Sequence, residues 1–270
     1  MEANMGNASK TPVLIALGSN LGDKRRNLDL ACERVAALDG VSEFQKSDWL
    51  STQPVGGPAS QEIFLNRAAT FTTSRPSVEL FHALKNIERQ LGRENTLRWG
   101  PRLIDVDLLL YGEEMFHDPA SDLHVPHPRM AFRHFVLAPA AEVAPDMRHP
   151  VIGWTISQLL EHLQTSPPVV VFGLKNQGQA NRLAAEVSTE SGASILSREQ
   201  RRDASWDDSL ISCVLYDGDS PPRESWQRPR LLIVEEYLPE MPRCPFIEVG
   251  EMSNEQAVTE IVAAIEAMRQ

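Results

Sequence analysis

The run from Ile104 to Tyr111 carries the two residues best placed for chemistry, Asp105 and Asp107. The run reads as a β-strand with four apolar residues on one face, namely Ile104, Val106, Leu108 and Leu110. Because side chains alternate along a strand, the two aspartates share the opposite face, with Cα atoms about 6.6 Å apart. Two carboxylates at that spacing suit divalent metal ions that also hold a polyphosphate. The ordinary alternative is a half-buried strand with a solvated acidic face, but Leu109 continues that face and argues against it.

Basic residues gather on either side of this acidic pair. The arginines are Arg93, Arg98, Arg102 and Arg133. The planar guanidinium pairs with two phosphate oxygens at once, although a single arginine is more often a solvated surface charge. His127 lies between two prolines, which hold it in place so that it could donate a hydrogen bond to a phosphate, although a histidine alone is more often an ordinary surface residue.

Length, charge and cysteine content limit the class of protein. The 270 residues suggest two modest domains or one large domain. The net charge of -11 argues against a general nucleic-acid or membrane-surface binder, while a polyphosphate needs only a local basic cluster. Three widely spaced cysteines without a Cys-x-x-Cys motif indicate reduced thiols in a cytoplasmic protein. We expect a disordered segment over residues 1–10, no secretory signal and no membrane span.

The order of elements in the first half predicts a ferredoxin-like α/β sheet. Strands are expected over residues 13–17, 42–51, 64–73 and 104–110. Helices are expected over residues 28–38 and 76–91, the second ending at Gly92. Strand, helix, strand, strand, helix, strand is the split βαβ pattern.

Three motifs together resemble the 6-hydroxymethyl-7,8-dihydropterin pyrophosphokinases of folate synthesis. They are Gly18-Ser19-Asn20-Leu21-Gly22, the run from Arg98 to Leu110, and Val125-Pro126-His127-Pro128-Arg129-Met130. The resemblance covers about residues 11–164 and implies a ferredoxin-like fold over a domain of residues 11–165. It also implies transfer of the terminal diphosphate of ATP to the pterin hydroxymethyl group, with release of AMP.

The resemblance assigns expected roles residue by residue. Asp105 and Asp107 would hold two Mg²⁺ ions, and ATP would be the co-substrate. The expected catalytic residues are Asp105, Asp107, Arg93 and Arg102. The expected ATP-binding residues are Glu88, Arg98, Trp99, Arg102, His127 and Arg133. The expected pterin-binding residues are Thr52, Pro54, Val55, Gly56, Phe64, Asn66 and Phe135. Without the family, core packing would be the better interpretation of the two phenylalanines.

The chain departs from the family pattern at three places. Gln53-Pro54 stands where relatives often have two prolines, and no arginine lies between Arg93 and Arg98 in the loop that follows Gly92. Lys85 stands at a nucleotide-side position that is often glutamine, and the sequence assigns it no role.

Residues 166–270 predict a small, mostly parallel Rossmann- or P-loop-like α/β domain. Expected strands cover residues 169–174, 210–216, 231–235 and 245–249, with a helix at 179–190; a further helix at 155–164 is expected before the boundary, in the first domain. A final helix begins at a capping box formed by Ser253 and Gln256.

A glycine-rich segment in this domain is spaced like a P-loop but lacks its chemistry. Gln179 and Ala180 stand where Lys and Ser or Thr should bind phosphate and Mg²⁺. The domain therefore resembles a degenerate P-loop nucleoside kinase, and we expect a catalytically inactive structural or partner-binding module. Residual nucleotide binding and an unrelated Rossmann-like unit are the alternatives.

Two alternative hypotheses concern the function of the whole chain. It could be a catalytically inactive pterin- or nucleotide-binding regulator, or a bifunctional enzyme with a C-terminal nucleoside kinase. The retained aspartates, Arg102 and His127 count against the first. The expected partners are the two small-molecule substrates, with no nucleic acid and no membrane. Binding of a protein, or self-association through the C-terminal domain, is left open.

Overall fold

A computed structural model describes eight segments of the chain. They are residues 10–55, 61–92, 102–166, 169–174, 176–196, 212–215, 230–236 and 243–269. The predicted disordered segment 1–10 lies, apart from Lys10, outside these residues.

The chain divides into two compact units, which are described separately. The first contains Met1–Met130 and Ala138–Val151, and the second contains Ala131–Leu137 and Ile152–Gln270. The predicted domain boundary between residues 165 and 166 stays a prediction.

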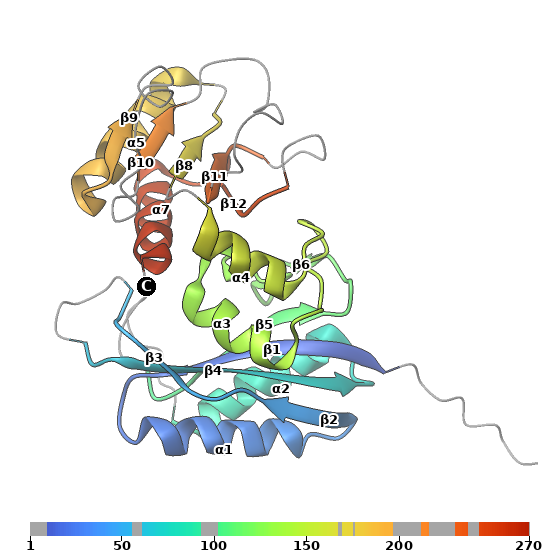
Figure 1. The fold of residues 1–270 in the computed structure, drawn as a ribbon. Helices are drawn as coiled ribbons and strands as arrows, with labels where there is room; N and C mark the ends of the chain where they lie inside the picture. Colours follow the sequence, from blue (N-terminus) through green and yellow to red (C-terminus); the bar gives the residue numbers. More distant parts are fainter. Residues whose placement is uncertain are drawn as a thin grey trace, which may run out of the picture. The chain divides into compact units, whose positions relative to one another are not determined.

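The first unit is built on an antiparallel sheet with two helices on one face (Figure 1). Its strands are β1 (Thr11–Ser19), β2 (Val41–Lys46), β3 (Leu50–Thr52), β4 (Phe64–Thr73) and β5 (Asp105–Tyr111). The order across the sheet is β2-β4-β1-β5, and β3 pairs with β4. The helices are α1 (Lys24–Ala36) and α2 (Ser77–Gln90). The predicted mixed α/β class is confirmed.

Helical spacing of apolar residues places α1 and α2 on the sheet. Helix α1 buries Leu28, Ala31, Cys32 and Val35, and α2 buries Leu80, Leu84 and Ile87. They share a core with alternate residues of β1, namely Val13, Ile15 and Leu17. Helix α2 ends next to Gly92, whose φ of +89° is the left-handed conformation that stops helices.

The single strand predicted over residues 42–51 is instead two strands, β2 and β3. The interruption begins at Ser47, where the side chain takes a place in the ladder. Its Oγ accepts a hydrogen bond from the Ala68 N–H at 3.0 Å, while its own N–H donates to the Ala68 carbonyl at 3.0 Å. A side-chain acceptor at this point replaces the backbone carbonyl that a continuous strand would offer.

A second correction concerns β5. Leu108 pairs with Ile15 and Leu110 pairs with Leu14, so Leu109 is an extra residue in the ladder. Such a bulge turns the following side chains over. Leu110 therefore leaves the helix-side core, which instead receives Tyr111, and the prediction that Leu110 shares a face with Val106 is wrong.

The connection after β5 contains elements that the sequence did not indicate. They are the hairpin strands β6 (Phe116–Asp118) and β7 (Leu123–Val125), the short helix η1 (Met130–Phe132) and α3 (His134–Val143). The sequence did not predict α3 because Pro139 lies inside it, and proline usually interrupts a helix. Residues 134–137 of this helix belong to the second unit and residues 138–143 to the first.

The second unit contains a parallel sheet. Its elements are α4 (Ile156–Thr165), β8 (Val169–Phe172), α5 (Gln177–Ser191), β9 (Ser194–Leu196), β10 (Ser212–Leu215), β11 (Leu231–Val234), β12 (Phe246–Glu248) and α7 (Asn254–Met268). The strand order is β12-β11-β8-β10-β9. The predicted capping box of the last helix is confirmed at Ser253 and Gln256. Among the described residues, no helix combines the length and apolarity needed to cross a membrane.

A buried histidine in the first unit predicts an acid-sensitive fold. Burial lowers the pKa of His149 from 6.5 to about 4. Between these values the unfolded chain binds a proton that the folded chain does not, so stability is complete above pH 6.5 and falls as the pH drops toward 4. The loss is on the order of 3 kcal/mol. We expect urea unfolding of His149→Gln to depend less on pH in this range than unfolding of the unaltered chain.

The exposed His82 supplies the matched control, and His82→Gln should keep the full dependence. An identical pH slope in all three proteins would contradict a role for His149.

Candidate functional site

The face of the first sheet opposite its helices has a floor of small residues beside the two aspartates. Gly18 of β1 pairs with Asp105 of β5 on one side and with Asn66 of β4 on the other. In the next row, Ala16 pairs with Asp107. Because neighbouring strands lie about 4.8 Å apart, Asp105 and Asn66 are roughly 10 Å apart across Gly18. Small residues leave room above the sheet between the acidic pair and Asn66.

Asp105 and Asp107 lie on the same face of β5, as predicted. Both are partly exposed, while Val106 and Leu108 between and after them are buried in the helix-side core. The exposed fractions of the two carboxylate side chains are 21% and 32%. The pair can therefore reach a ligand in solvent while its strand is held by the core.

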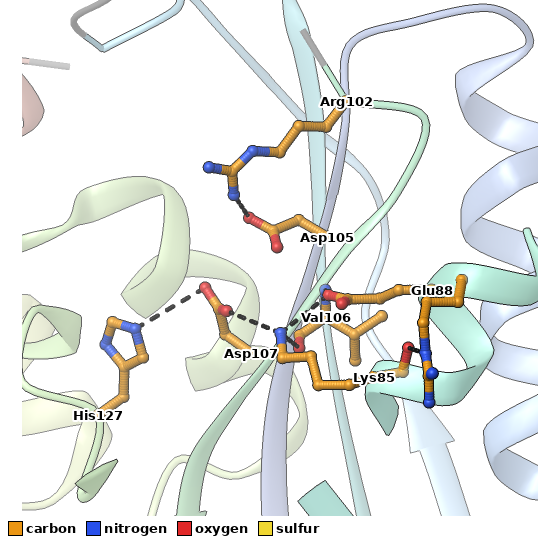
Figure 2. Close-up of polar contacts among 8 residues, drawn as sticks. Lys85, Glu88, Arg102, Asp105, Val106, Asp107 and His127 are labelled. Carbon is orange, nitrogen blue, oxygen red and sulfur yellow. Dashed lines mark hydrogen bonds and ion pairs between the residues drawn. The ribbon is translucent and has the colours of Figure 1, made fainter. Parts of the chain in front are cut away.

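Arg102 is directed at Asp105, and its guanidinium donates to the carboxylate (Figure 2). Asn20 fixes the backbone of Arg102 from both sides. The side-chain Oδ1 of Asn20 accepts a hydrogen bond from the backbone N–H of Arg102 at 2.7 Å. The backbone N–H of Asn20 donates to the Arg102 carbonyl at 3.1 Å. Ser19 Oγ donates to the Leu103 carbonyl at 2.7 Å. The glycine-serine-asparagine motif thus holds the residues that lead into the acidic strand.

Asp107 lies between two nitrogen-bearing side chains (Figure 2). Lys85 Nζ is 3.8 Å from Asp107 Oδ1, and His127 Nε2 is 3.8 Å from Asp107 Oδ2. Lys85 also donates to the Val106 carbonyl at 2.8 Å and to Glu88 Oε1 at 2.9 Å. The ammonium group is therefore fixed by two hydrogen bonds beside the acidic pair.

The bulge in β5 and the turn after β7 orient His127. Its N–H donates to the carbonyl of the bulged Leu109 at 2.9 Å. Its Nδ1 accepts from the Arg129 N–H at 3.1 Å. An imidazole whose Nδ1 accepts carries its proton on Nε2, the nitrogen that faces Asp107. His127 thus presents a donor to the site.

Glu88 has a clear structural contact. Its side chain is 3% exposed, and its Oε1 accepts from the Val106 N–H at 2.6 Å. That N–H lies on an edge strand, where a side-chain acceptor satisfies it in place of another strand. Glu88 joins α2 to β5 and fixes Lys85, and its predicted contact with the nucleotide stays a prediction.

Three of the predicted pterin residues come together where β3 meets β4. Asn66 Nδ2 donates to Thr52 Oγ1 at 2.8 Å, and Phe64 pairs with Thr52. A Cβ atom on Gly18 would lie 3.4 Å from Asn66 Oδ1 and 3.9 Å from the Phe64 ring, so both side chains lie over this glycine.

The remaining predicted residues fall into three groups. Pro54 and Val55 follow β3 and are partly exposed. Arg133 and Phe135 belong to the second unit, where the Arg133 guanidinium lies 5.6 Å from the centre of the Phe135 ring. Four residues lie outside the described segments, namely Gly56, Arg93, Arg98 and Trp99.

Sequence reasoning assigned no role to three residues of the site: Ala16, Asn20, which was named only as part of a family motif, and Lys85, which was placed on the nucleotide side without a role. Alternation along β1 could have indicated Ala16, because Ala16 and Gly18 are small residues on the face opposite Val13, Ile15 and Leu17. No local pattern could have indicated Lys85, because its contacts depend on the packing of α2 against β5.

Comparisons with known proteins agree on one family. Residues 14–145 match the model of 7,8-dihydro-6-hydroxymethylpterin-pyrophosphokinase. A Synechocystis relative named 2-amino-4-hydroxy-6-hydroxymethyldihydropteridine pyrophosphokinase is 37% identical over 150 residues, which cover 56% of this chain and 75% of that protein. A Pseudomonas aeruginosa relative of the same name is 41% identical over 138 residues, or 51% of this chain and 83% of that protein.

Among solved structures, a crystal structure of Plasmodium falciparum HPPK-DHPS aligns with 82% of this chain and 58% of that chain. The TM-score is 0.44 and the identity is 10%, a likeness too distant to support an inference.

Lys85 predicts a measurable effect on metal binding at Asp107. The ammonium group lies 3.8 Å from Asp107 Oδ1, so it would repel a cation bound to that carboxylate. Two unit charges about 4 Å apart repel by about 1 kcal/mol under water-like screening. We expect Lys85→Gln to bind Mn²⁺, measured by electron paramagnetic resonance, about fivefold more tightly.

Lys46→Gln is the matched control, because Lys46 pairs with Asp29 and not with the acidic pair. Weaker Mn²⁺ binding by Lys85→Gln would show that the lysine orients Asp107 and does not oppose the cation.

Proposed function

We propose that Asp105 and Asp107 are the metal-binding groups of this protein. The chain belongs to the 7,8-dihydro-6-hydroxymethylpterin-pyrophosphokinase family and is an ATP-dependent diphosphotransferase of folate synthesis. In the proposed reaction the pterin hydroxymethyl oxygen bonds to the β-phosphorus of ATP. The bond from that phosphorus to the α–β bridging oxygen breaks, AMP leaves with that oxygen, and the hydroxyl proton passes to solvent.

The donor set of the acidic pair fits magnesium. Both groups are carboxylates, they share one face of β5, and both are partly exposed. Magnesium prefers such oxygen ligands and keeps water or phosphate oxygens in its other positions. When bound, magnesium neutralises charge on the polyphosphate. We propose two ions, since two carboxylates along one strand offer one anchoring group to each.

Cationic and donor groups beside the pair suit the rest of the polyphosphate. The Arg102 guanidinium can exchange its Asp105 contact for phosphate oxygens in the same planar geometry. His127 presents its Nε2 proton on the other side of Asp107. We propose that these side chains hold ATP together with Glu88 and Arg133, and with Arg93, Arg98 and Trp99 of the loop before β5. Catalysis then rests on positioning and electrostatic stabilisation.

The group around Asn66 suits the flat pterin ring. Asn66 and Thr52 offer hydrogen-bonding atoms, and Phe64 offers an aromatic face beside them. We propose that the pterin binds here with the backbone of Pro54, Val55 and Gly56 at its edge and with Phe135 as a second aromatic face. The roughly 10 Å across Gly18 matches a ring bound at Asn66 with its hydroxymethyl group directed toward the acidic pair.

Finer descriptions of fold and location extend this proposal. The order of elements in the first unit supports a ferredoxin-like fold. Cys32 is a free and buried thiol, which supports a cytoplasmic location.

We propose that the C-terminal domain is catalytically inactive. Its glycine-rich segment follows β8, at the carboxyl end of a parallel strand where open α/β sheets bind ligands. Two of the amide groups there already have partners. The Gly173 N–H donates to the Ile233 carbonyl at 2.8 Å, and the Gln179 N–H donates to Asn176 Oδ1 at 3.0 Å. Lys175 lies outside the described residues.

A direct test compares products of the full chain with Mg-ATP and the reduced pterin alcohol. We expect AMP and diphosphorylated pterin in equal amounts. Asp105→Asn and Asp107→Asn should each lower turnover about a hundredfold or more, because each removes a charge beside the transferred group. Asp39→Asn, at an exposed aspartate of the same unit, should not. Both variants should still bind the pterin, measured by quenching of its fluorescence, because β1 lies between the strand that carries the aspartates and the strand that carries Asn66.

Unchanged turnover in both aspartate variants would place the metal site elsewhere. Pterin binding without AMP release by the unaltered chain would favour the inactive regulator.

The inactive C-terminal domain is tested separately in the full Asp107→Asn chain. We expect no phosphorylated nucleoside when ATP is supplied with each common nucleoside and no pterin. A phosphorylated nucleoside would establish the bifunctional enzyme instead.

A further inference from the structure

The β6–β7 hairpin of the first unit carries a pair of histidines that the pyrophosphokinase reaction does not use. His117 on β6 pairs directly with His124 on β7. Their ring centres are 3.9 Å apart, and the ring planes are inclined by 16°. Directly opposed residues of an antiparallel pair project from the same face of the ladder. The two imidazoles are thus held side by side by the backbone of the hairpin.

Asp122 adds an anionic oxygen to this pair. It lies in the turn that leads into β7, and His124 Nε2 is 3.5 Å from its Oδ1. One ligand atom from each of the three side chains lies within 4.8 Å of the other two. Asp122 has a φ of 55°, an uncommon conformation for a residue other than glycine, and aspartate is among the few that adopt it. The turn thereby brings the carboxylate to the histidines.

These distances are close to those of a tetrahedral metal site. Zinc bonds of about 2.0–2.1 Å place neighbouring ligand atoms about 3.3 Å apart. The Asp122–His124 distance of 3.5 Å already meets that requirement, and side-chain rotation closes the remainder. We propose that His117, Asp122 and His124 form a binding site for a divalent transition-metal ion of the zinc type.

The chemistry of the ligands separates this site from the acidic pair on β5. Imidazole nitrogens favour zinc, copper and nickel, whereas carboxylate and phosphate oxygens favour magnesium. Three protein ligands leave the fourth position of a tetrahedral ion to water.

The expected physical effect of the ion is to join the two strands of the hairpin. His127, the residue that faces Asp107, lies three residues after His124 in the sequence. An ion that binds the folded hairpin more tightly than the unfolded chain raises the thermal midpoint of the protein. The site requires no particular activity of the chain, so it stands independently of the proposed function.

The test is zinc titration of the full chain, without an added histidine tag and with millimolar Mg²⁺ to occupy the acidic pair. Nitrogen-15 NMR of the imidazoles should show shifts of two histidines, saturating at one zinc per chain. In calorimetry, His117→Ala and His124→Ala should each weaken zinc binding at least tenfold. His82→Ala, at an exposed histidine of α2, is the matched control and should leave binding unchanged.

Asp122→Asn keeps the shape of the side chain while removing its charge, and should weaken zinc binding by a smaller factor. Zinc affinity of the His117→Ala and His124→Ala variants equal to that of the unaltered chain would overturn the proposal. Imidazole signals of the unaltered chain that do not move with one equivalent of zinc would also overturn it. Because the NMR measurement uses the unaltered protein, misfolding of a variant does not leave the question open.

Discussion

The pairing of β5 with β1 is the constraint on which the site depends. Val106 and Leu108 are buried against the helices, so Asp105 and Asp107 must face the other way. A slip of one residue would bury both carboxylates in an apolar core, where unpaired charges are very costly. Burial of the two apolar residues thus fixes the direction of the two functional ones.

The same pairing explains how distant segments reach the site. The extra residue in β5, Leu109, offers its carbonyl to the His127 N–H and so places the histidine next to Asp107. On the other side, Glu88 binds the backbone of Val106 and fixes Lys85. Asn20, at the end of β1, holds Arg102. Each contact reaches β5 or the residues that lead into it, so displacement of this strand would affect all of them.

The sequence was sufficient to predict a structural feature wherever residue type, or the spacing of apolar residues along one helix or strand, determined it. Alternation predicted the shared face of Asp105 and Asp107, and the spacing of Leu80, Leu84 and Ile87 predicted α2. The prediction from sequence was wrong where contacts between different elements determined the structure. Ser47 interrupts a strand through a hydrogen bond to β4, and the bulge at Leu109 exists only in relation to β1.

Much of the site depends on the meeting of separate elements. Lys85, three residues before Glu88 on α2, has an electrostatic role only because α2 packs on β5, so its sequence position alone assigned nothing. In contrast, the motif Gly18-Ser19-Asn20 was recognised by resemblance, and its packing and hydrogen bonds now give it a physical reason. Gly18 provides the floor, while Ser19 and Asn20 hold the chain that carries Arg102.

The central claim is that Asp105 and Asp107 together bind metal that also binds ATP. The most direct measurement is a crystal structure with a non-hydrolysable ATP analogue and Mn²⁺, whose anomalous scattering locates the ions. We expect anomalous peaks within bonding distance of both carboxylates and of the polyphosphate. Peaks elsewhere, or aspartate oxygens turned away from a bound nucleotide, would contradict this claim.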